Sequence, residues 1–247
     1  METEPESLRP LPWEDANNTE GRVAKALATV KALFGDPSEA GRAIGARAQV
    51  GPAVGFFAFL GLPCQWIATA MARWAQAGRP DQMAYVMRYF HLPEQPAPTA
   101  QQLAFQSTLG WFQVAAFPLI AAIGMLIFGA LAHGGLWMVK GLRNGKGIEI
   151  SYRTLLYASG AFGWIGLINA AGVFLPGGAF WVHQAFSLAL ALGFITFQGM
   201  LLAEAHGVER WRGIVGVFLP GFILCCLCAC CAGALGAGIA SLSRGHA

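Results

Sequence analysis

The sequence predicts an all-α, polytopic transmembrane helical bundle with five spans, the N-terminus in the cytoplasm and the C-terminus outside. The chain of 247 residues is 55% hydrophobic and only 12% charged, with a mean hydropathy of +0.51. A soluble domain usually carries about a quarter charged residues. Five apolar runs are long enough to cross about 30 Å of hydrocarbon, and basic residues gather on alternate connections between them.

None of the five apolar runs contains Asp, Glu, Lys or Arg. A charge at the bilayer centre costs about 2.5–3.5 kcal/mol on insertion scales, so charge-free runs of this length predict membrane spans. The runs are Val50–Met71, Gly110–Val139, Thr154–Leu175, Gly178–Ala203 and Gly213–Ala240. Little more than Pro176-Gly177 joins the third run to the fourth, which predicts a tight antiparallel hairpin.

The distribution of Lys and Arg predicts the orientation. Most of them lie before the first run and in the loops after the second and fourth, and the positive-inside rule places these segments in the cytoplasm. The candidate cytoplasmic face consists of Lys140, Arg143, Lys146, Tyr152, Arg153, His206, Arg210 and Arg212.

The rest of the chain divides into an N-terminal appendix and a short tail. Residues 1–20 are acidic and contain proline, a composition typical of disorder. Residues 21–49 predict cytoplasmic amphipathic helices, the first with an apolar face at the membrane surface and the second capped by Asp36 before Pro37. The apolar face consists of Val23, Leu27, Val30 and Phe34. Residues 50–240 form the membrane domain, and residues 241–247 form an outer tail.

Polar side chains inside the predicted spans are the first candidates for function, because intramembrane ionisable groups are costly. The candidates are His133, Asn169, His183, Gln184 and Gln198, with Gln65 and Gln113 as further polar positions. His133 lies near the cytoplasmic end of its span and His183 near the outer end of its own. Since no Asp or Glu lies in mid-membrane, ordinary hydrogen bonding between helices is the favoured interpretation. A transport pathway built on these side chains is the alternative.

No catalytic motif is present: there is no nucleophile elbow, Walker loop, HExxH sequence or carboxylate pair. Ser151 and Ser159 have no base near them in the sequence. Glu204, His206 and Glu209 could ligate a metal, but loop charges are usually solvated. The sequence therefore predicts no enzyme, no metal and no cofactor, and the absence of a nucleic-acid motif predicts no nucleic-acid partner.

A cysteine cluster marks the fifth run, at Cys225, Cys226, Cys228, Cys230 and Cys231. Its CxxC spacing would suit a soft metal. Thiols in lipid stay protonated, however, and Cys packs as a small hydrophobe. Small-xxx-small registers such as Ala229, Gly233 and Ala237 accompany the cluster and allow close helix approach. Packing within one subunit is the favoured interpretation, and a homo-oligomer face is the alternative.

Several ordered motifs resemble the bacterial branch of the Yip (Ypt-interacting protein) domain family. They are PWE at Pro12–Glu14, FGDPSEAGRAI, ALAHGGL around His133, GKGIEISYRTLLYAS, FLPGG followed by Trp181, and AEAHGVERWRGIVGVFLP. The resemblance implies five spans, a cytoplasmic N-terminus and a bacterial inner-membrane location. Eukaryotic relatives contact Rab-type GTPases. Only Gly51-Pro52 remains of their DLxGP signature, which argues against GTPase binding by this chain.

These patterns together predict a non-enzymatic, multi-pass protein of the cell inner membrane that organises or scaffolds the membrane. It would act through helix packing and its basic cytoplasmic loops. Membrane lipids and either a membrane-protein partner or a second copy of the chain are the expected partners. The alternative function is a small transporter or channel for an ion, a lipid or a small polar solute.

Overall fold

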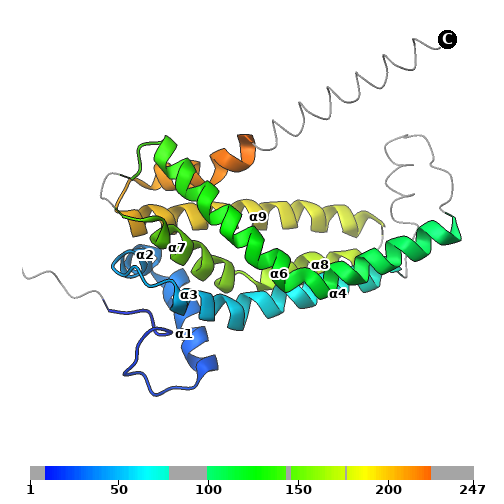
Figure 1. Cartoon of the computed structure of the whole chain (residues 1–247), viewed down its shortest axis with the longest axis horizontal. Coiled ribbons are helices and arrows are strands. Elements are labelled where there is room, and N and C mark those ends of the chain that lie inside the picture. Colours follow the sequence, from blue (N-terminus) through cyan, green and yellow to red (C-terminus); the bar gives the residue numbers. More distant parts are fainter. Residues whose placement is uncertain (1–8, 78–98, 143–145, 176, 224–247) are drawn as a thin grey trace, which may run out of the picture.

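The computed structural model describes residues 9–77, 99–142, 146–175 and 177–223, and within these ranges every regular element is a helix. The elements are α1 (Arg22–Gly35), α2 (Pro37–Gly45), α3 (Gly51–Phe56), η1 (Phe57–Gly61), α4 (Leu62–Ala77), α6 (Ala100–Met138), α7 (Ile148–Ala161), α8 (Trp164–Ala171), η2 (Gly172–Phe174) and α9 (Gly177–His206). Helices α4, α6 and α9 run along the long axis, and α1 and α2 lie at one end, here named the N-terminal end (Figure 1).

Three helical stretches are long and apolar enough to cross a membrane: Gly51–Ala75, Ala100–Met138 and Ala179–His206. They confirm the first, second and fourth predicted spans as helices of the expected kind. The bent pair α7 and α8 would make a fourth span. Residues 210–223 are also helical, but the rest of the predicted fifth span, with its cysteine cluster, lies outside the described residues. Five spans and their orientation stay predictions.

The third predicted span differs from a straight helix. It begins at Ile148, six residues before the expected start, and it bends by 46° between α7 and α8. The break falls beside a close helix contact, because a Cβ atom on Gly163 would lie 2.8 Å from the Cα atom of Gly61. The early start moves Arg153 from the predicted loop into the second turn of α7.

The first span contains one π-helical turn, η1, between α3 and α4. Pro63 lies two residues after the end of this turn and has no N–H to donate back along the helix, which gives a physical reason for the local widening. The turn packs against α7, where a Cβ atom on Gly61 would lie 2.8 Å from the Cα atom of Gly160. Backbones therefore meet closely at the centre of the bundle.

The cap predicted at Asp36 is confirmed, and the structure adds a second cap at Thr99. The Asp36 carboxylate accepts hydrogen bonds from the main-chain N–H groups of Ser38 and Glu39, with Pro37 in the first turn of α2. Thr99 and Gln102 form a reciprocal capping box at the start of α6. Each cap satisfies N–H groups that the first helical turn leaves without partners.

Helix α1 is amphipathic, and the residues that it buries in the bundle differ from the apolar face predicted to lie at the membrane surface. Ala26, Thr29 and Leu33 are buried, whereas Val23 and Leu27 are 63% and 61% exposed. The predicted face therefore stays on the surface at its N-terminal half, where it can still meet lipid headgroups.

Helix α2 packs on the end of α9 through two glycines. A Cβ atom on Gly45 would lie 2.7 Å from the main-chain carbon of Ala205, and one on Gly41 would lie 2.6 Å from the Cβ atom of Glu204. These contacts join the N-terminal appendix to the membrane domain. The main core lies at this end and includes Leu33, Ile44, Phe56, Tyr157 and Leu201.

Candidate functional site

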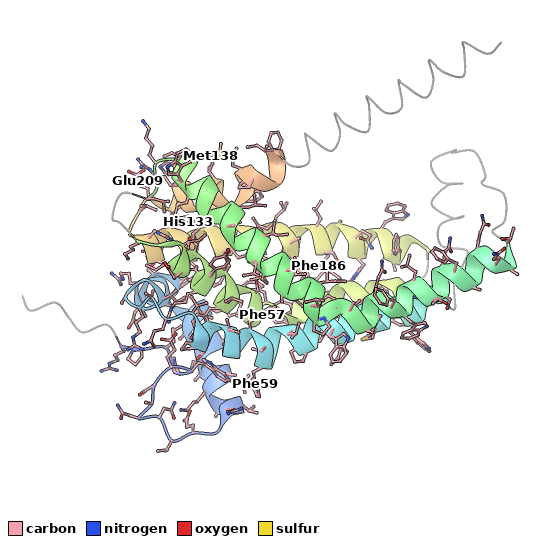
Figure 2. The ribbon with its side chains drawn as sticks, viewed as in Figure 1. Phe57, Phe59, His133, Met138, Phe186 and Glu209 are labelled. Atoms are coloured by element: carbon pink, nitrogen blue, oxygen red, sulfur yellow. The ribbon has the colours of Figure 1, made fainter. Side chains whose placement is uncertain are left out.

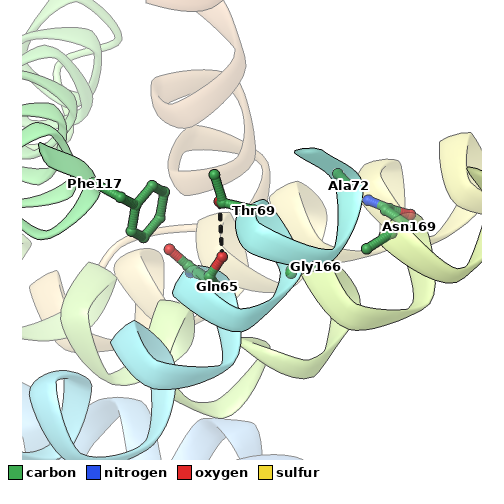
Figure 3. Close-up of a pocket in the computed structure, with 8 residues that line it drawn as sticks. Gln65, Thr69, Ala72, Phe117, Gly166 and Asn169 are labelled. Atoms are coloured by element: carbon green, nitrogen blue, oxygen red, sulfur yellow. Dashed lines mark hydrogen bonds between the residues drawn. The ribbon is translucent and has the colours of Figure 1, made fainter. Parts of the chain in front are cut away.

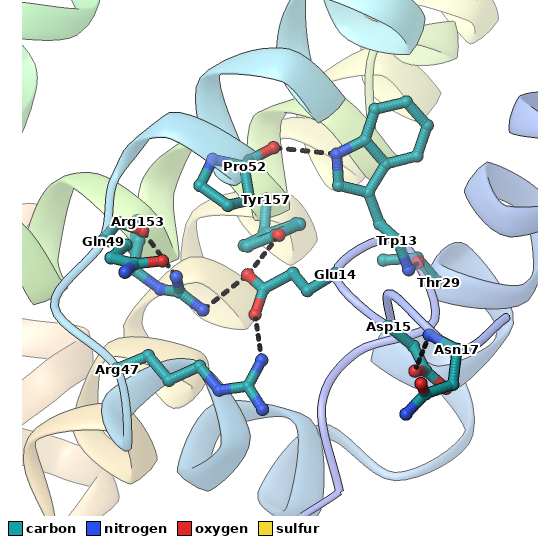
Figure 4. A network of polar contacts seen from close by, with 10 residues as sticks. All are labelled: Trp13, Glu14, Asp15, Asn17, Thr29, Arg47, Gln49, Pro52, Arg153 and Tyr157. Atoms are coloured by element: carbon teal, nitrogen blue, oxygen red, sulfur yellow. Dashed lines mark hydrogen bonds and ion pairs between the residues drawn. The ribbon is translucent and has the colours of Figure 1, made fainter.

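A buried ion-pair network ties the N-terminal segment to α7 (Figure 4). The Arg153 guanidinium donates to the Glu14 carboxylate over 2.5 Å, and the Tyr157 hydroxyl donates to the same carboxylate oxygen, also over 2.5 Å. Arg47 donates to the other Glu14 oxygen over 3.2 Å. A second donor of Arg153 reaches the main-chain oxygen of Gln49. We call Glu14, Arg47, Arg153 and Tyr157 the N-terminal clamp.

Two charges of the clamp are withdrawn from solvent, whereas the Arg47 side chain is 40% exposed. The Arg153 side chain is 0% exposed and the Glu14 side chain 3% exposed. Removing ions from water costs several kcal/mol each, and close pairing offsets that cost. Arg153 was expected on an exposed cytoplasmic loop. It is instead buried, because α7 starts early enough to turn this residue toward the core.

The N-terminal segment is a second correction. Residues 1–20 were expected to be disordered, but residues 9–20 are placed against the bundle. Leu11 is buried, and the Trp13 indole donates to the main-chain oxygen of Pro52 over 2.9 Å. The Trp13 ring also packs edge-on against Phe56. The acidic composition predicted disorder here, but one of the acidic residues, Glu14, is the counter-ion of the buried Arg153.

A second polar cluster joins three helices near the same end. Ser151 on α7 lies 3.0 Å from the Nδ1 atom of His133 on α6 and 3.0 Å from the Nε2 atom of His206 on α9. One hydroxyl can donate to one ring nitrogen and accept from an N–H of the other. The expectation that Ser151 has no nearby base is therefore wrong, since two imidazoles approach it across the fold. His206, expected in a solvated loop, is buried.

This His–Ser–His cluster is arranged for support rather than for attack on a substrate. Ser151 is fully buried and packed between helices, so a substrate carbonyl has no access to its oxygen. A nucleophilic serine has to reach its substrate as well as its base. The cluster instead gives hydrogen bonds to the buried Ser151 hydroxyl and to one ring nitrogen of each histidine.

Lys146 caps the C-terminal end of α9. Its ammonium group donates to the main-chain oxygen of Ala205 over 2.5 Å. Helix C-termini carry carbonyl groups without partners and a partial negative charge, both of which favour a cation. Burial lowers the pKa of Lys146 below its ordinary value. This residue of the predicted cytoplasmic face is therefore a structural cap.

The other basic residues of that face form a surface network. Arg210 pairs with Glu204 at 2.9 Å and donates to the Ser38 hydroxyl, which links α9 to α2. Arg212 pairs with Glu209 and donates to the main-chain oxygen of Lys140. Arg143 lies outside the described residues. Exposed pairs of this kind contribute little stability individually, but here they orient the loop after α9.

The remaining candidates are dispersed. Gln198 is 1% exposed and donates to the Ser159 hydroxyl, whereas Gln184 is exposed on α9. His183 lies 3.3 Å from Ser187 on the next turn, far along the chain from the His133 cluster. The Tyr152 hydroxyl donates to the main-chain oxygen of Leu126 on α6. The structure therefore brings His133, His206 and Lys146 to one end, and His183 to the other end of α9.

A groove of about 380 Å³ lies between α4, α6 and α8 (Figure 3). Its polar lining residues are Gln65, Thr69 and Asn169. Of these, only Asn169 was among the leading candidates. The structure places Asn169 beside two α4 residues, which sequence spacing could not show. We call this cavity the α4–α8 groove.

Across the described parts of the chain, no three His, Cys, Asp or Glu side chains come together in a group that could hold a metal ion. The suggested set of Glu204, His206 and Glu209 is separated by the roles of its members. His206 contacts Ser151, while the two glutamates pair with arginines.

Comparison with protein-family models, with curated proteins and with solved structures finds no match for the chain. The resemblance to the Yip family therefore stays a prediction. The structure assigns the chain to a broader class, helical membrane proteins. The described residues form an all-helical protein with three to four helices apolar and long enough to cross a membrane.

Proposed function

We propose that this chain is a non-enzymatic, multi-pass protein of the bacterial inner membrane that acts as a scaffold for neighbouring membrane components. In this proposal the N-terminal end faces the cytoplasm, and the apolar helix faces meet lipids and a membrane-protein partner or a second copy. The observation that carries the proposal is the exposure of α6. Only five of its 39 residues are buried.

Large apolar side chains are exposed along most of α6, and they include Phe112, Leu119 and Leu126. Figure 2 shows side chains projecting outward from α6 and α9, with Met138 and Phe186 among them. Within a membrane such a surface packs against lipid tails or another helix. A scaffold also needs a rigid part that holds this surface in place. The N-terminal clamp and the packing of α2 on α9 support such a role.

A transporter is the second candidate, and the α4–α8 groove favours it because Asn169, Gln65 and Thr69 line one cavity. The groove does not include His133 or His183, the ionisable groups first considered for a pathway. No lining residue of the groove is charged. These features favour binding over the passage of an ion.

Photo-crosslinking in native membranes separates the two functions. A photoreactive residue at Phe112 or Leu119 on α6 is expected to give protein adducts, because the scaffold uses this surface. The same probe at Leu136, which is fully buried, is the matched control and should give none. Proteoliposomes should show no solute flux above empty liposomes. Lipid adducts alone at both exposed positions, or saturable flux, would contradict the scaffold role.

A further inference from the structure

Two side-chain amides line the α4–α8 groove without a hydrogen-bond partner among the described residues: Gln65 and Asn169. The third polar residue, Thr69, is satisfied, because its hydroxyl donates to the main-chain oxygen of Gln65 over 2.9 Å (Figure 3). Each free amide carries two donor hydrogens and one acceptor oxygen. The groove thus presents hydrogen-bonding capacity that the protein itself does not use.

The groove lies in predicted membrane spans, where leaving its amide groups without hydrogen bonds costs free energy. Gln65 and Thr69 belong to the candidate span Gly51–Ala75, and Asn169 belongs to the bent pair that would form another span. Gln65 is half-buried and Asn169 is exposed, so their amides face whatever fills the groove. At the edge of the hydrocarbon, where water is scarce, a polar group without a partner costs free energy. An occupant that accepts hydrogen bonds from the amide N–H groups would remove this cost.

The lining of the groove restricts that occupant. The other side chains are Ala68, Ala72, Phe117, Gly166 and Ala170, so no charged group is present. The small residues leave the space, and Phe117 supplies an apolar wall (Figure 3). A volume of about 380 Å³ is at the low end for ligand cavities. It is too small for a helix, which is about 10–12 Å across with its side chains.

We propose that the α4–α8 groove binds one membrane lipid through an acyl ester carbonyl that accepts hydrogen bonds from the Gln65 and Asn169 amides. The acyl chain lies against Phe117 and the small residues. The uncharged lining makes the site selective for the carbonyl linkage and indifferent to headgroup charge. Phe117 of α6 belongs to this site, but Phe112 and Leu119, the α6 positions at which the scaffold role is tested, do not.

The test uses the purified full-length chain in nanodiscs with a diacyl lipid that carries a photoreactive group near its ester linkages. A second probe has the same headgroup and chains but ether linkages, and therefore no carbonyl. The ester probe is expected to label peptides of α4 and α8. The ether probe should label them roughly fivefold less for each hydrogen bond lost, the equivalent of about 1 kcal/mol.

Substitutions test whether the two amides cause the difference in labelling between the ester and ether probes. Gln65→Leu and Asn169→Leu keep the side-chain size and should each lower ester labelling roughly fivefold, the net worth of one hydrogen bond. Gln184→Leu, which removes an exposed amide of α9 outside the groove, is the matched control and should label as the wild type does.

Equal labelling by ester and ether probes on the wild-type chain would overturn the proposal, and this comparison does not depend on how well any variant folds. Unchanged labelling of folded Gln65→Leu and Asn169→Leu would also overturn it. So would labels spread evenly over exposed positions such as Leu126, because they would show bulk lipid contact only. None of these results bears on the crosslinks expected at Phe112 and Leu119.

Discussion

Glu14→Gln is expected to destabilise the folded protein by about 3–5 kcal/mol, the usual cost of removing one partner from a buried ion pair. Glutamine keeps the shape of the side chain but removes its charge. Arg153, whose side chain is 0% exposed, would then be an uncompensated buried cation. The free energy of unfolding in mixed micelles measures the effect.

Two control variants show whether the loss of stability in Glu14→Gln comes from the broken ion pair. Glu20→Gln removes an exposed acid of the same segment and should change the free energy of unfolding by less than about 0.5 kcal/mol, as surface changes do. The double variant Glu14→Leu with Arg153→Met should recover most of the lost stability, because a buried ion pair can often be replaced by apolar residues at little cost. A Glu14→Gln effect as small as that of Glu20→Gln would show that the clamp does not fix the N-terminal segment.

Gly45→Ala is expected to weaken the packing of α2 on α9 by about 1–3 kcal/mol, the usual cost of overpacking a tight contact. The new methyl group would lie 2.7 and 2.8 Å from two main-chain atoms of Ala205. Main-chain atoms of α9 cannot turn aside as a flexible side chain can, so α2 has to move. Trypsin cleavage after Arg47, in the loop that follows α2, should accelerate accordingly.

Gly35→Ala provides the matched control, because nothing lies within 4 Å of the position of its new methyl group. It should leave the cleavage rate unchanged or lower it slightly, since alanine favours helix more than glycine does. If Gly45→Ala and Gly35→Ala behave alike, α2 does not pack on α9 in the way described.

Signals that act over a few residues were predictable from the sequence. Asp36 was identified as a cap because its carboxylate bonds to N–H groups two and three residues away. The apolar runs were found for a similar reason, since a span is defined by its own composition. The bend between α7 and α8 was missed because it depends on a contact with Gly61 of the first span.

The polar clusters could not be predicted because their members are distant in the chain. Glu14 and Arg153 are separated by 139 residues, and Ser151 and His206 by 55. Composition assigned Glu14 to a disordered acidic segment, and local sequence left Ser151 without a base. The sequence signals for the clamp were the PWE motif, which holds Glu14, and the GKGIEISYRTLLYAS motif, which holds Arg153 and Tyr157. Both entered through a family resemblance and not through their chemistry.

The central claim is a multi-pass membrane protein with its N-terminal end in the cytoplasm, and cysteine accessibility tests it most directly. Single cysteines would replace Glu149 at the N-terminal end, Gln101 at the start of α6 and Ala247 at the C-terminus, in a chain from which the six native cysteines have been removed. We expect a membrane-impermeant thiol reagent to label positions 101 and 247 in intact cells, and position 149 only after permeabilisation. Labelling of position 149 in intact cells would contradict the orientation, and protection of position 247 would contradict the fifth span.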